Sequence, residues 1–444
     1  MTMLAQISAA MHTVLTTTTE AAATMLHYAK RPDRAKFTPN TLVQTLVFGW
    51  LATPEGTVEQ LAQMASRLGV DVSPQAIDQR FTPATATLLQ EVLTASLQQV
   101  ISADPVAIPI LQRFTSVRVH DSTTIGLPDA LTTTWAGCGN ATGRGTAGRK
   151  CGVQVDLLTG ALCGLDLAAG RASDHTLPVQ HAPLPAGSLR LADLGFYDLD
   201  VLHTLDEAGT CWLSRLQTNR RLTLPGQPER SLLAVLDSFG AASEWDGPVL
   251  VGKGGRVAAR LLARRVPPAV AEERRRRIRA AAKDKGRAPA KAALALAAWN
   301  IMITNLPPAL LSLEEALVRL RLRWQIELLF KLWKSHGKVA AWRSANPMRI
   351  LCEVYAKLLA LVFHQWLIVA SGWGDPERSL FKAAQVVRSY AAELASAFGD
   401  AEQYMTILRR MACVLQRFAR MNQRRTTPTT AQQLCALTAG SIEA

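Results

Sequence analysis

Two aspartates stand directly after predicted strands, where acidic side chains are free to act on a ligand. Asp121 follows the alternating run Ser116–His120, and Asp193 follows the short run Ser188–Ala192. If these strands are neighbours in one sheet, the two carboxylates lie side by side and repel one another unless a cation lies between them. Hard divalent cations prefer oxygen ligands, so the pair indicates a metal site of the magnesium type.

A third acidic candidate, Glu327, lies in a helical segment that is otherwise apolar, so it needs a partner if it faces inward. Positions 323, 327 and 334 follow position 320 by 3, 7 and 14 residues, which places all four within an arc of roughly 60° on a helix. Arg323, Glu327 and Lys334 therefore form one stripe, with two cations flanking one anion. An intrahelical salt bridge between Arg323 and Glu327 explains the spacing equally well without any ligand.

The elements that must position these side chains have an informative order. After a helical region over residues 1 to about 105, three strands, then strand, helix and strand, are expected at Ser116–His120, Gly152–Leu158, Ala161–Leu167, Ser188–Ala192, Asp198–Ala208 and Cys211–Leu216. This is the order of a ribonuclease-H-like core of mixed α/β class. We expect that core at 109–345, interrupted by a β-rich insertion at 217–298, with helical regions at 1–108 and 346–444.

The glutamate itself is expected on a long helix. Ser312 and Glu315 form a capping box that starts this helix, and it ends near Gly337. The last helical region, 346–444, is a candidate dimerisation region and finishes in a polar tail from Thr426.

The N-terminal region contains the outline of a helix-turn-helix. Thr57 caps a helix that runs to Arg67, Gly69 ends it, and Ser73–Pro74 starts a second helix that continues to Phe81. Such a pair reads DNA in many proteins, but many all-helical domains contain one without that role.

The charge balance favours a polyanionic partner. Lys and Arg exceed Asp and Glu by 49 to 35, a formal net charge of +14, which is typical of nucleic-acid-binding proteins and also of basic proteomes in general. The run Arg274–Arg279 is either a solvated basic helix or a contact to DNA phosphates.

The remaining composition excludes other classes. The seven cysteines include no CxxC pair, so neither a zinc knuckle nor a disulfide scaffold is indicated, and reduced thiols favour a cytoplasmic protein. The start of the chain lacks the pattern of a signal peptide. The most apolar stretch, Leu351–Ala370, contains Glu353, Lys357 and His364, so we expect a buried helix there rather than a membrane span.

Three motifs in order give the chain a family resemblance. Asp121 lies in Asp-Ser-Thr, Asp193 lies in Ala-Asp-x-Gly-Phe-Tyr, and Arg323, Glu327 and Lys334 form Arg-x3-Glu-x6-Lys after Asn305–Leu306–Pro307. Over about residues 110–345 the chain resembles bacterial insertion-sequence transposases of the DDE type, in the fourth-numbered insertion-sequence family with its Tyr–Arg–Glu–Lys signature. The tyrosine position holds Leu320, which cannot donate the hydrogen bond to DNA that the tyrosine is thought to make in relatives.

The resemblance implies a role for each candidate residue. Asp121, Asp193 and Glu327 would ligate two Mg²⁺ ions, with Mn²⁺ as a substitute, and Arg323, Lys331 and Lys334 would contact DNA phosphates. Trp299 matches a tryptophan on which relatives stack a flipped-out base, although packing in the core explains it equally well. Arg149 and Lys150 end a glycine-rich basic stretch from Gly143 that we expect to be a DNA-contacting loop.

The implied activity is cut-and-paste transposition through a hairpin intermediate, with double-stranded element ends and target DNA as partners and a homodimer bridging two ends. The implied location is the bacterial cytoplasm, at the nucleoid. Two other interpretations stay open: a catalytically impaired remnant that regulates by binding DNA, and a ribonuclease-H-like nuclease that cuts without rejoining. Among neighbouring residues, His120 is expected to be a packed strand histidine, and Asp198 and Asp200 are expected to start a helix rather than to bind metal.

Overall fold

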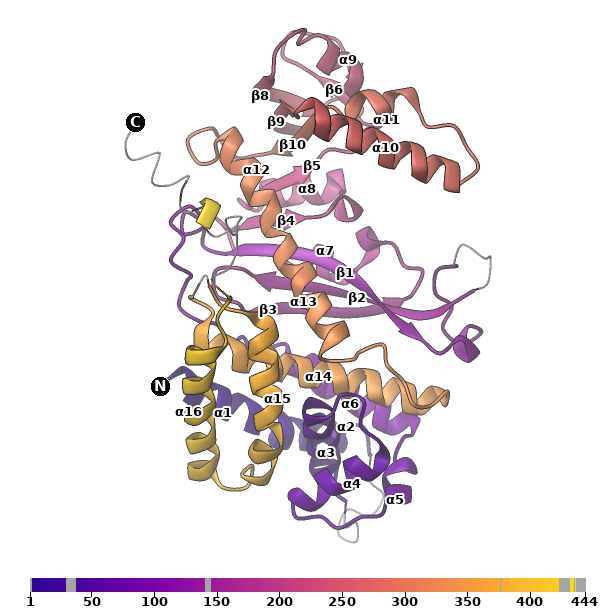
Figure 1. Ribbon diagram of the computed structural model, residues 1–444, viewed down its shortest axis with the longest axis vertical. Coiled ribbons are helices and arrows are strands. Elements are labelled where there is room, and N and C mark those ends of the chain that lie inside the picture. Colours follow the sequence, from indigo (N-terminus) through magenta and orange to yellow (C-terminus); the bar gives the residue numbers. More distant parts are fainter. Residues whose placement is uncertain are drawn as a thin grey trace. The chain divides into compact units, whose positions relative to one another are not determined.

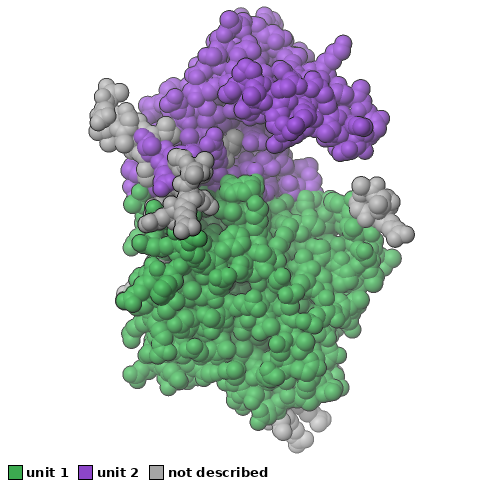
Figure 2. Space-filling view, in the orientation of Figure 1, with its two compact units in different colours: residues 1–107, 122–172, 324–428 green, residues 108–121, 173–323, 429–444 purple. Residues whose placement is uncertain are grey.

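A computed structural model describes residues 2–28, 37–139, 145–375, 377–422, 432–434 and 436, without the side chains of residues 320 and 371. The chain forms two compact units (Figure 2). Unit 1 contains Met1–Ala107, Ser122–Ala172 and Trp324–Pro428, and unit 2 contains Ile108–Asp121, Ser173–Arg323 and Thr429–Ala444. The predicted boundary near residue 108 lies within one residue of a boundary between the units, but the predicted boundary at 345 has no counterpart, because residues 122–172 and 324–345 of the predicted catalytic segment belong to unit 1. Gly143 and the start of the polar tail at Thr426 lie outside the described residues.

Unit 1 is mainly helical, as predicted for both ends of the chain. Its long helix α14 packs against α3, α6 and α16, and α15 lies beside α16 (Figure 1). The helices are α1 (Met3–Thr13), the π-helix η1 (Val14–Thr18), α2 (Thr19–Met25), α3 (Pro39–Ala52), α4 (Val58–Arg67), α5 (Pro74–Asp78), α6 (Pro83–Ser96), the short 3-10 helix η3 (Asp129–Leu131), α13 (Trp324–Ser335), α14 (Pro347–Gly372), α15 (Leu380–Ser396) and α16 (Ala401–Phe418).

The expected helix pair in the N-terminal region is present, but its second helix is shorter than predicted. Thr57 forms a capping box with Gln60 at the start of α4, and Gly69 has a positive φ of 79° after its end. α5 ends at Asp78 instead of continuing to Phe81, because Thr82 caps the next helix, α6, only four residues later. A DNA-reading role for this pair remains a prediction.

The apolar helix α14 is buried, as expected. By length and composition it could span a membrane, but every residue of its most apolar window lies inside the structure. Its two buried charged residues pair with one another: Lys357 Nζ lies 2.8 Å from Glu353 Oε1. The same ammonium donates to the backbone carbonyls of Lys338 and Ala341 at 3.0 and 2.9 Å. The pair therefore fixes the segment that follows α13 against α14.

A hairpin completes unit 1 and corrects one prediction. Strands β2 (Ala147–Asp156) and β3 (Leu162–Ala169) pair antiparallel, and Arg149 and Lys150 lie within β2, opposite Ala169 and Ala168. They are therefore strand residues and not part of a flexible loop, because the ladder to β3 fixes their backbone. The hairpin turn contains Gly160 at a φ of 75°, where any Cβ would overlap the Trp373 ring.

Unit 2 is built on a mixed sheet. Its strands follow the order β1-β4-β5-β10-β9-β8-β6-β7, with β1, β4 and β5 parallel and β10 antiparallel to β5 and β9. They are β1 (Val117–Leu127, which continues into unit 1), β4 (Leu189–Ala192), β5 (Cys211–Arg215), β6 (Arg221–Thr223), β7 (Arg230–Ser231), β8 (Glu244–Val251), β9 (Val257–Arg265) and β10 (Trp299–Thr304). The segment 217–298 contributes strands β6, β7, β8 and β9 to this sheet, but it is not β-rich as predicted, because the helices α9, α10 and α11 contain more of its residues than the strands do.

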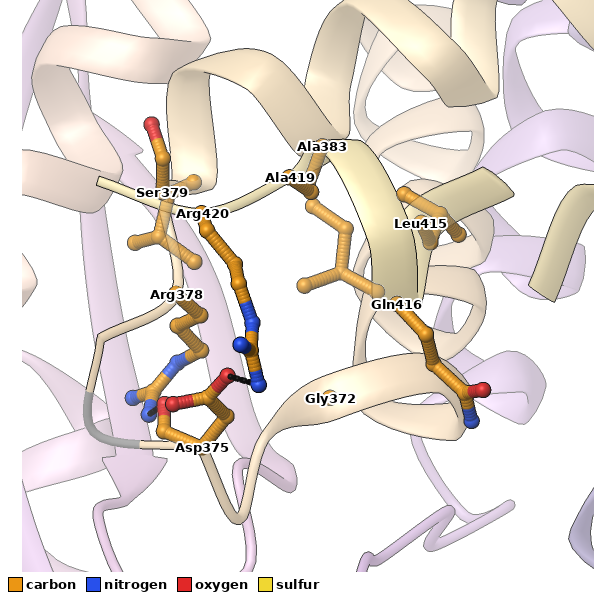
Figure 3. Close-up of a pocket in the computed structure, with 11 residues that line it drawn as sticks. Gly372, Asp375, Arg378, Ser379, Ala383, Leu415, Gln416, Ala419 and Arg420 are labelled. Atoms are coloured by element: carbon orange, nitrogen blue, oxygen red, sulfur yellow. Dashed lines mark hydrogen bonds and ion pairs between the residues drawn. The ribbon is translucent and has the colours of Figure 1, made fainter. Parts of the chain in front are cut away.

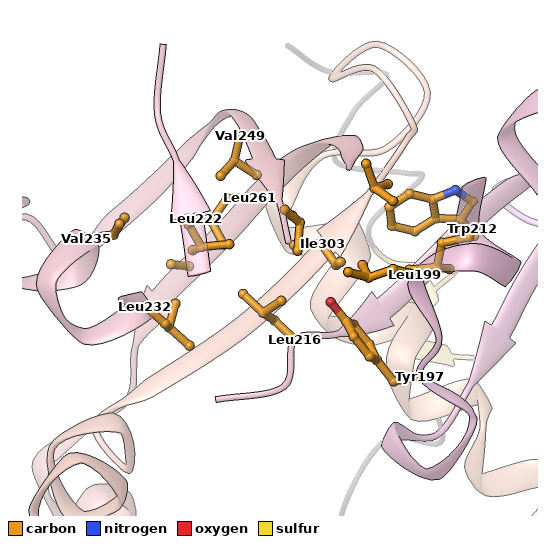
Figure 4. Packing of buried hydrophobic residues seen from close by; sticks show 14 of the residues in the cluster. Tyr197, Leu199, Trp212, Leu216, Leu222, Leu232, Val235, Val249, Leu261 and Ile303 are labelled. Atoms are coloured by element: carbon orange, nitrogen blue, oxygen red, sulfur yellow. The ribbon is translucent and has the colours of Figure 1, made fainter. Parts of the chain in front are cut away.

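The hydrophobic core of unit 2 is formed by side chains of the sheet and of the helices that pack on it. Side chains from β6, β8, β9, β10 and α9 converge in one hydrophobic cluster (Figure 4), with Leu222, Val249, Leu261 and Ile303 among its fully buried members. The helices of unit 2 are the 3-10 turns η4 (Asp174–Thr176) and η5 (Leu194–Phe196), with α7 (Pro178–His181), α8 (Leu199–Glu207), α9 (Leu232–Asp237), α10 (Pro268–Asp284), α11 (Lys291–Leu296) and α12 (Leu313–Leu322).

The long helix predicted from Ser312 is interrupted. Ser312 and Glu315 form the expected capping box, but α12 ends at Leu322 and α13 begins at Trp324. Arg323 is the single turn residue between them. The shared helix face is therefore described only for Glu327 and Lys334, which both lie on α13. The side chain of Leu320 lies outside the described residues.

We expect Lys357→Met to lower the free energy of unfolding by about 3–5 kcal/mol, because it leaves the Glu353 carboxylate buried without its cation. Urea denaturation monitored by circular dichroism measures this loss. The matched control is Lys382→Met, which removes a lysine that donates to Asn422 at the exposed surface. The double variant with Glu353→Leu should recover most of the loss, and equal losses in Lys357→Met and the control would contradict the assignment.

Candidate active site

The register of two parallel strands brings the first two candidates together. In the pairing of β1 with β4, His120 lies opposite Ala192, so the following residues, Asp121 and Asp193, are neighbours across the ladder. The two strands are adjacent, as the sequence predicted. One detail differs: β4 ends before Asp193, but β1 continues to Leu127, so Asp121 lies inside its strand rather than after it.

One guanidinium contacts both carboxylates. Arg323 Nη1 donates to Asp121 Oδ2 at 2.9 Å, and Arg323 Nε lies 3.8 Å from Asp193 Oδ1. The side chains of Arg323 and Asp121 are 17% and 15% exposed, while Asp193 is 40% exposed, so solvent screens the second contact more than the first. The positive charge that two adjacent carboxylates require is supplied here by Arg323.

His120 does not supply that charge. Its side chain is fully buried against the Phe196 ring, and burial, followed by the positive charges of Arg190 and Arg118, holds its pKa well below the ordinary value. The ring is therefore neutral at pH 7. His120 is packed within its strand, as the sequence predicted.

Two residues that the sequence analysis did not single out hold the turn after Asp193. Buried Arg190 donates to Gln180 Oε1 at 2.7 Å and to the Phe196 carbonyl at 3.5 Å, and burial lowers its pKa to about 10. Gly195 lies so close to the Asp174 carboxylate that a Cβ would overlap it. An arginine inside the apolar strand Leu189–Ala192 was the sequence signal for this support, since a buried cation needs acceptors.

The third carboxylate is described within unit 1. Glu327 is half-buried in the first turn of α13, whose apolar face buries Ile326, Leu329, Phe330, Leu332 and Trp333. Lys334, seven residues later, lies on the same side of the helix and is exposed. In the part of the chain that the structure describes, no group of three or more His, Cys, Asp or Glu side chains forms a metal-ligand cluster. The convergence of Glu327 on Asp121 and Asp193 therefore stays a prediction.

Comparison with known proteins assigns the chain to a family. The profile of the transposase DDE domain matches residues 112–363, more than half of the chain. The chain belongs to the DDE transposases. It is 26% identical over 398 residues to the transposase for insertion sequence element IS231F of Bacillus thuringiensis subsp. israelensis, covering 82% of each chain. It is 25% identical over 428 residues to that of IS231E of B. thuringiensis subsp. finitimus, covering 90% of this chain and 88% of the relative.

A more distant relative agrees. The transposase for insertion sequence element IS1151 of Clostridium perfringens is 24% identical over 337 residues, 70% of each chain. The enzyme class that the motifs predicted, a DDE transposase of an insertion sequence, is therefore confirmed.

In this transposase Trp299 lies in the core of unit 2. Its side chain is 7% exposed, belongs to the hydrophobic cluster, and has the Arg265 guanidinium 4.3 Å from its ring centroid. Of the two interpretations of Trp299, the structure therefore shows packing in the core. A base could stack on its ring only after neighbouring side chains moved.

The basic run of the transposase forms part of an exposed helix. In α10, Glu272 pairs with Arg275 and Arg279, and Glu273 pairs with Arg276 and Arg277. Two carboxylates thus serve four guanidiniums, which leaves the surface of the helix positive.

Asp198 and Asp200 have the structural roles that the sequence predicted. Asp198 caps α8 by accepting from the backbone of Asp200 and Val201, and Asp200 pairs with Arg256. Lys331 is exposed on α13, with its ammonium 4.0 Å from the centroid of the Trp324 ring.

A concave feature of unit 1 has no catalytic arrangement. A pocket of about 350 Å³ lies between the end of α14 and helices α15 and α16 (Figure 3). Its Asp375 carboxylate pairs with Arg420 at 3.0 Å, and Arg378 donates to the carbonyls of Trp373 and Asp375. These polar groups satisfy one another.

We expect Trp299→Ala to lower the free energy of unfolding of the DNA-free transposase by about 3–5 kcal/mol, because it empties a filled position in the core. Thermal and urea denaturation measure the loss. Trp324→Ala, which truncates a tryptophan that is 45% exposed, is the matched control and should cost much less. Unchanged stability of the Trp299 variant would instead favour a role limited to base stacking.

Proposed function

We propose that the transposase binds the terminal inverted repeats of its insertion sequence, cuts the DNA at those ends and joins them to target DNA, using two divalent metal ions held by Asp121, Asp193 and Glu327. Mg²⁺ is the expected ion, with Mn²⁺ as a substitute. In the same proposal the catalytic core is ribonuclease-H-like, and the enzyme belongs to the fourth-numbered insertion-sequence family.

The observation that carries the proposal is the pairing of Asp121 and Asp193 on adjacent parallel strands, with a cation between them. The fit to a divalent metal rests on the donor set: the paired groups are carboxylates, whose oxygens hard divalent ions prefer. Bound there, the ions would activate the attacking oxygen and stabilise the leaving oxygen of the phosphodiester. Glu327 would complete the ligand set from α13.

In the same proposal, five basic side chains orient the DNA backbone. Arg323 has a planar fork of donors that suits a phosphate, and the exposed ammonium groups of Lys331 and Lys334 extend positive charge along α13. Arg149 and Lys150 add two half-buried cations on β2. In this scheme, water first cleaves one strand, and the released 3′-hydroxyl then attacks the opposite strand to give a hairpin that is reopened before joining.

Further parts of the proposal follow from the family resemblance. A homodimer would bridge two element ends, and the nucleoid of the bacterial cytoplasm would be its place of action. The net charge of +14 suits both element ends and target DNA as partners.

Asp193→Asn should reduce strand cleavage by at least about 1,000-fold, because it removes one charged metal ligand from the transition state. Asp121→Asn and Glu327→Gln should have the same effect. Gel analysis of a duplex carrying the ends of the encoding element, incubated with Mg²⁺, measures cleavage and joining. The matched control is Asp198→Asn, which keeps the cap of α8 and should leave cleavage unchanged. Equal cleavage by Asp193→Asn and wild type would reject the mechanism.

The same assay separates the alternatives. Efficient cutting by the wild type without hairpin or joined products would favour a ribonuclease-H-like nuclease. Tight binding of the repeats without any cutting would favour a remnant that acts as a regulator, with Leu320 as the first residue to restore to tyrosine.

The exposed face of α10 supports a contact to the DNA backbone, and we expect the double variant Arg276→Gln/Arg277→Gln to weaken binding to any duplex. Each lost phosphate contact should reduce the slope of log affinity against log salt by about 0.9. Fluorescence anisotropy at several salt concentrations measures this slope. Arg409→Gln/Arg410→Gln removes two exposed arginines from α16 as a matched control. An unchanged slope in the α10 variant would show that its arginines only form the intrahelical ladder with Glu272 and Glu273.

A further inference from the structure

Arg323 holds the place that a divalent ion would take in the proposed function. Its guanidinium donates to Asp121 at 2.9 Å and lies 3.8 Å from Asp193, so it already neutralises part of the charge of this pair. Both Asp121 and Arg323 are mostly buried, which makes their contact stronger than a surface ion pair. A metal ion bound to these carboxylates would compete with Arg323 for their negative charge.

Arg323 is the one turn residue between α12 and α13, and its backbone keeps right-handed helical angles, with φ −53° and ψ −28°. A change of partner at this residue is therefore a movement of its side chain. A guanidinium presents five donors on a long, flexible stem, and phosphate accepts the same forked geometry as carboxylate. The residue can therefore exchange one anion for another without leaving this part of the fold.

We propose that Arg323 is the counterion of Asp121 and Asp193 in the metal-free protein, and that its transfer from these carboxylates to a DNA phosphate couples metal binding to DNA binding. The inference rests on the proposed function, because it takes the aspartate pair as metal ligands. A metal ion loosens Arg323 from the aspartates and frees it for phosphate. Phosphate draws Arg323 away and frees the aspartates for metal.

The coupling is reciprocal, as linkage requires, so each ligand raises the affinity of the other by the same factor. Metal-free protein without DNA would then bind the ion weakly, because the ion competes with an attached cation. The site would fill mainly when a DNA backbone is present.

Mn²⁺ binding to the DNA-free protein tests the first half of the inference, with the loss of the free Mn²⁺ signal in electron paramagnetic resonance as the readout. Arg323→Gln should bind Mn²⁺ on the order of tenfold more tightly than wild type. Arg323→Lys, which keeps the charge, should stay closer to wild type.

The matched control is Arg321→Gln. It removes the same charge two residues away from an exposed side chain that donates to Gln433 Oε1. Only a small change is expected there, because solvent screens a distant exposed charge. Equal tightening in Arg321→Gln and Arg323→Gln would show a general charge effect and would overturn the counterion role.

Asp193→Asn distinguishes a failure of the counterion role of Arg323 from a failure of the proposed metal site. If Mn²⁺ binding is lost in Asp193→Asn but Arg323→Gln does not tighten it, this inference fails and the proposed metal site stands. If Asp193→Asn binds Mn²⁺ as well as wild type, the proposed metal site itself fails.

The second half is tested through DNA affinity, measured by anisotropy with and without Ca²⁺, which takes oxygen ligands as Mg²⁺ does. Ca²⁺ should strengthen duplex binding by the wild type, and this gain should shrink in Arg323→Gln even after its weaker binding without Ca²⁺ is taken into account. An equal gain in both proteins would overturn the coupling.

Discussion

Two like charges that must be neighbours set the main constraint on this fold. The parallel pairing of β1 and β4 places Asp121 beside Asp193, and such a pair is stable only with a cation at hand. In the DNA-free protein described here a side chain, Arg323, meets that need. The same electrostatic demand would favour the divalent ions of the proposed function.

The surrounding structure limits where that cation can come from. His120, the residue before Asp121, is buried and neutral, so it adds no charge to the pair. Arg190 is turned to the other side of its strand, where it holds Gln180 and the turn after Asp193. The positive charge comes instead from Arg323, which directly follows the last residue of α12.

Buried polarity is handled in the same way elsewhere in the chain. Glu353 and Lys357 lie inside the apolar helix α14. The Lys357 ammonium is satisfied there by the Glu353 carboxylate and by two backbone carbonyls, and the Glu353 carboxylate is satisfied by Lys357. The extended sheet of unit 2 buries Trp299 under the Arg265 guanidinium. In both cases a buried or half-buried cation contacts an anion, a backbone carbonyl or an aromatic ring, and this contact holds two elements of the fold together.

Local physics gave the sequence its predictive power for the strands, the caps and the motifs. Alternation identified β1, and β4 was expected as a short strand. The caps at Thr57 and Ser312 started helices where expected, and the three motifs indicated the transposase family. Each of these signals depends on residues close together in the chain. Contacts between distant segments decided the rest. Pairing with β3 makes Arg149 and Lys150 strand residues and not loop residues, and packing in the core covers Trp299. The Arg323 side chain contacts carboxylates some 200 and 130 positions earlier in the chain. Helical periodicity cannot reveal such partners, since it records only which residues share a face and not what that face meets.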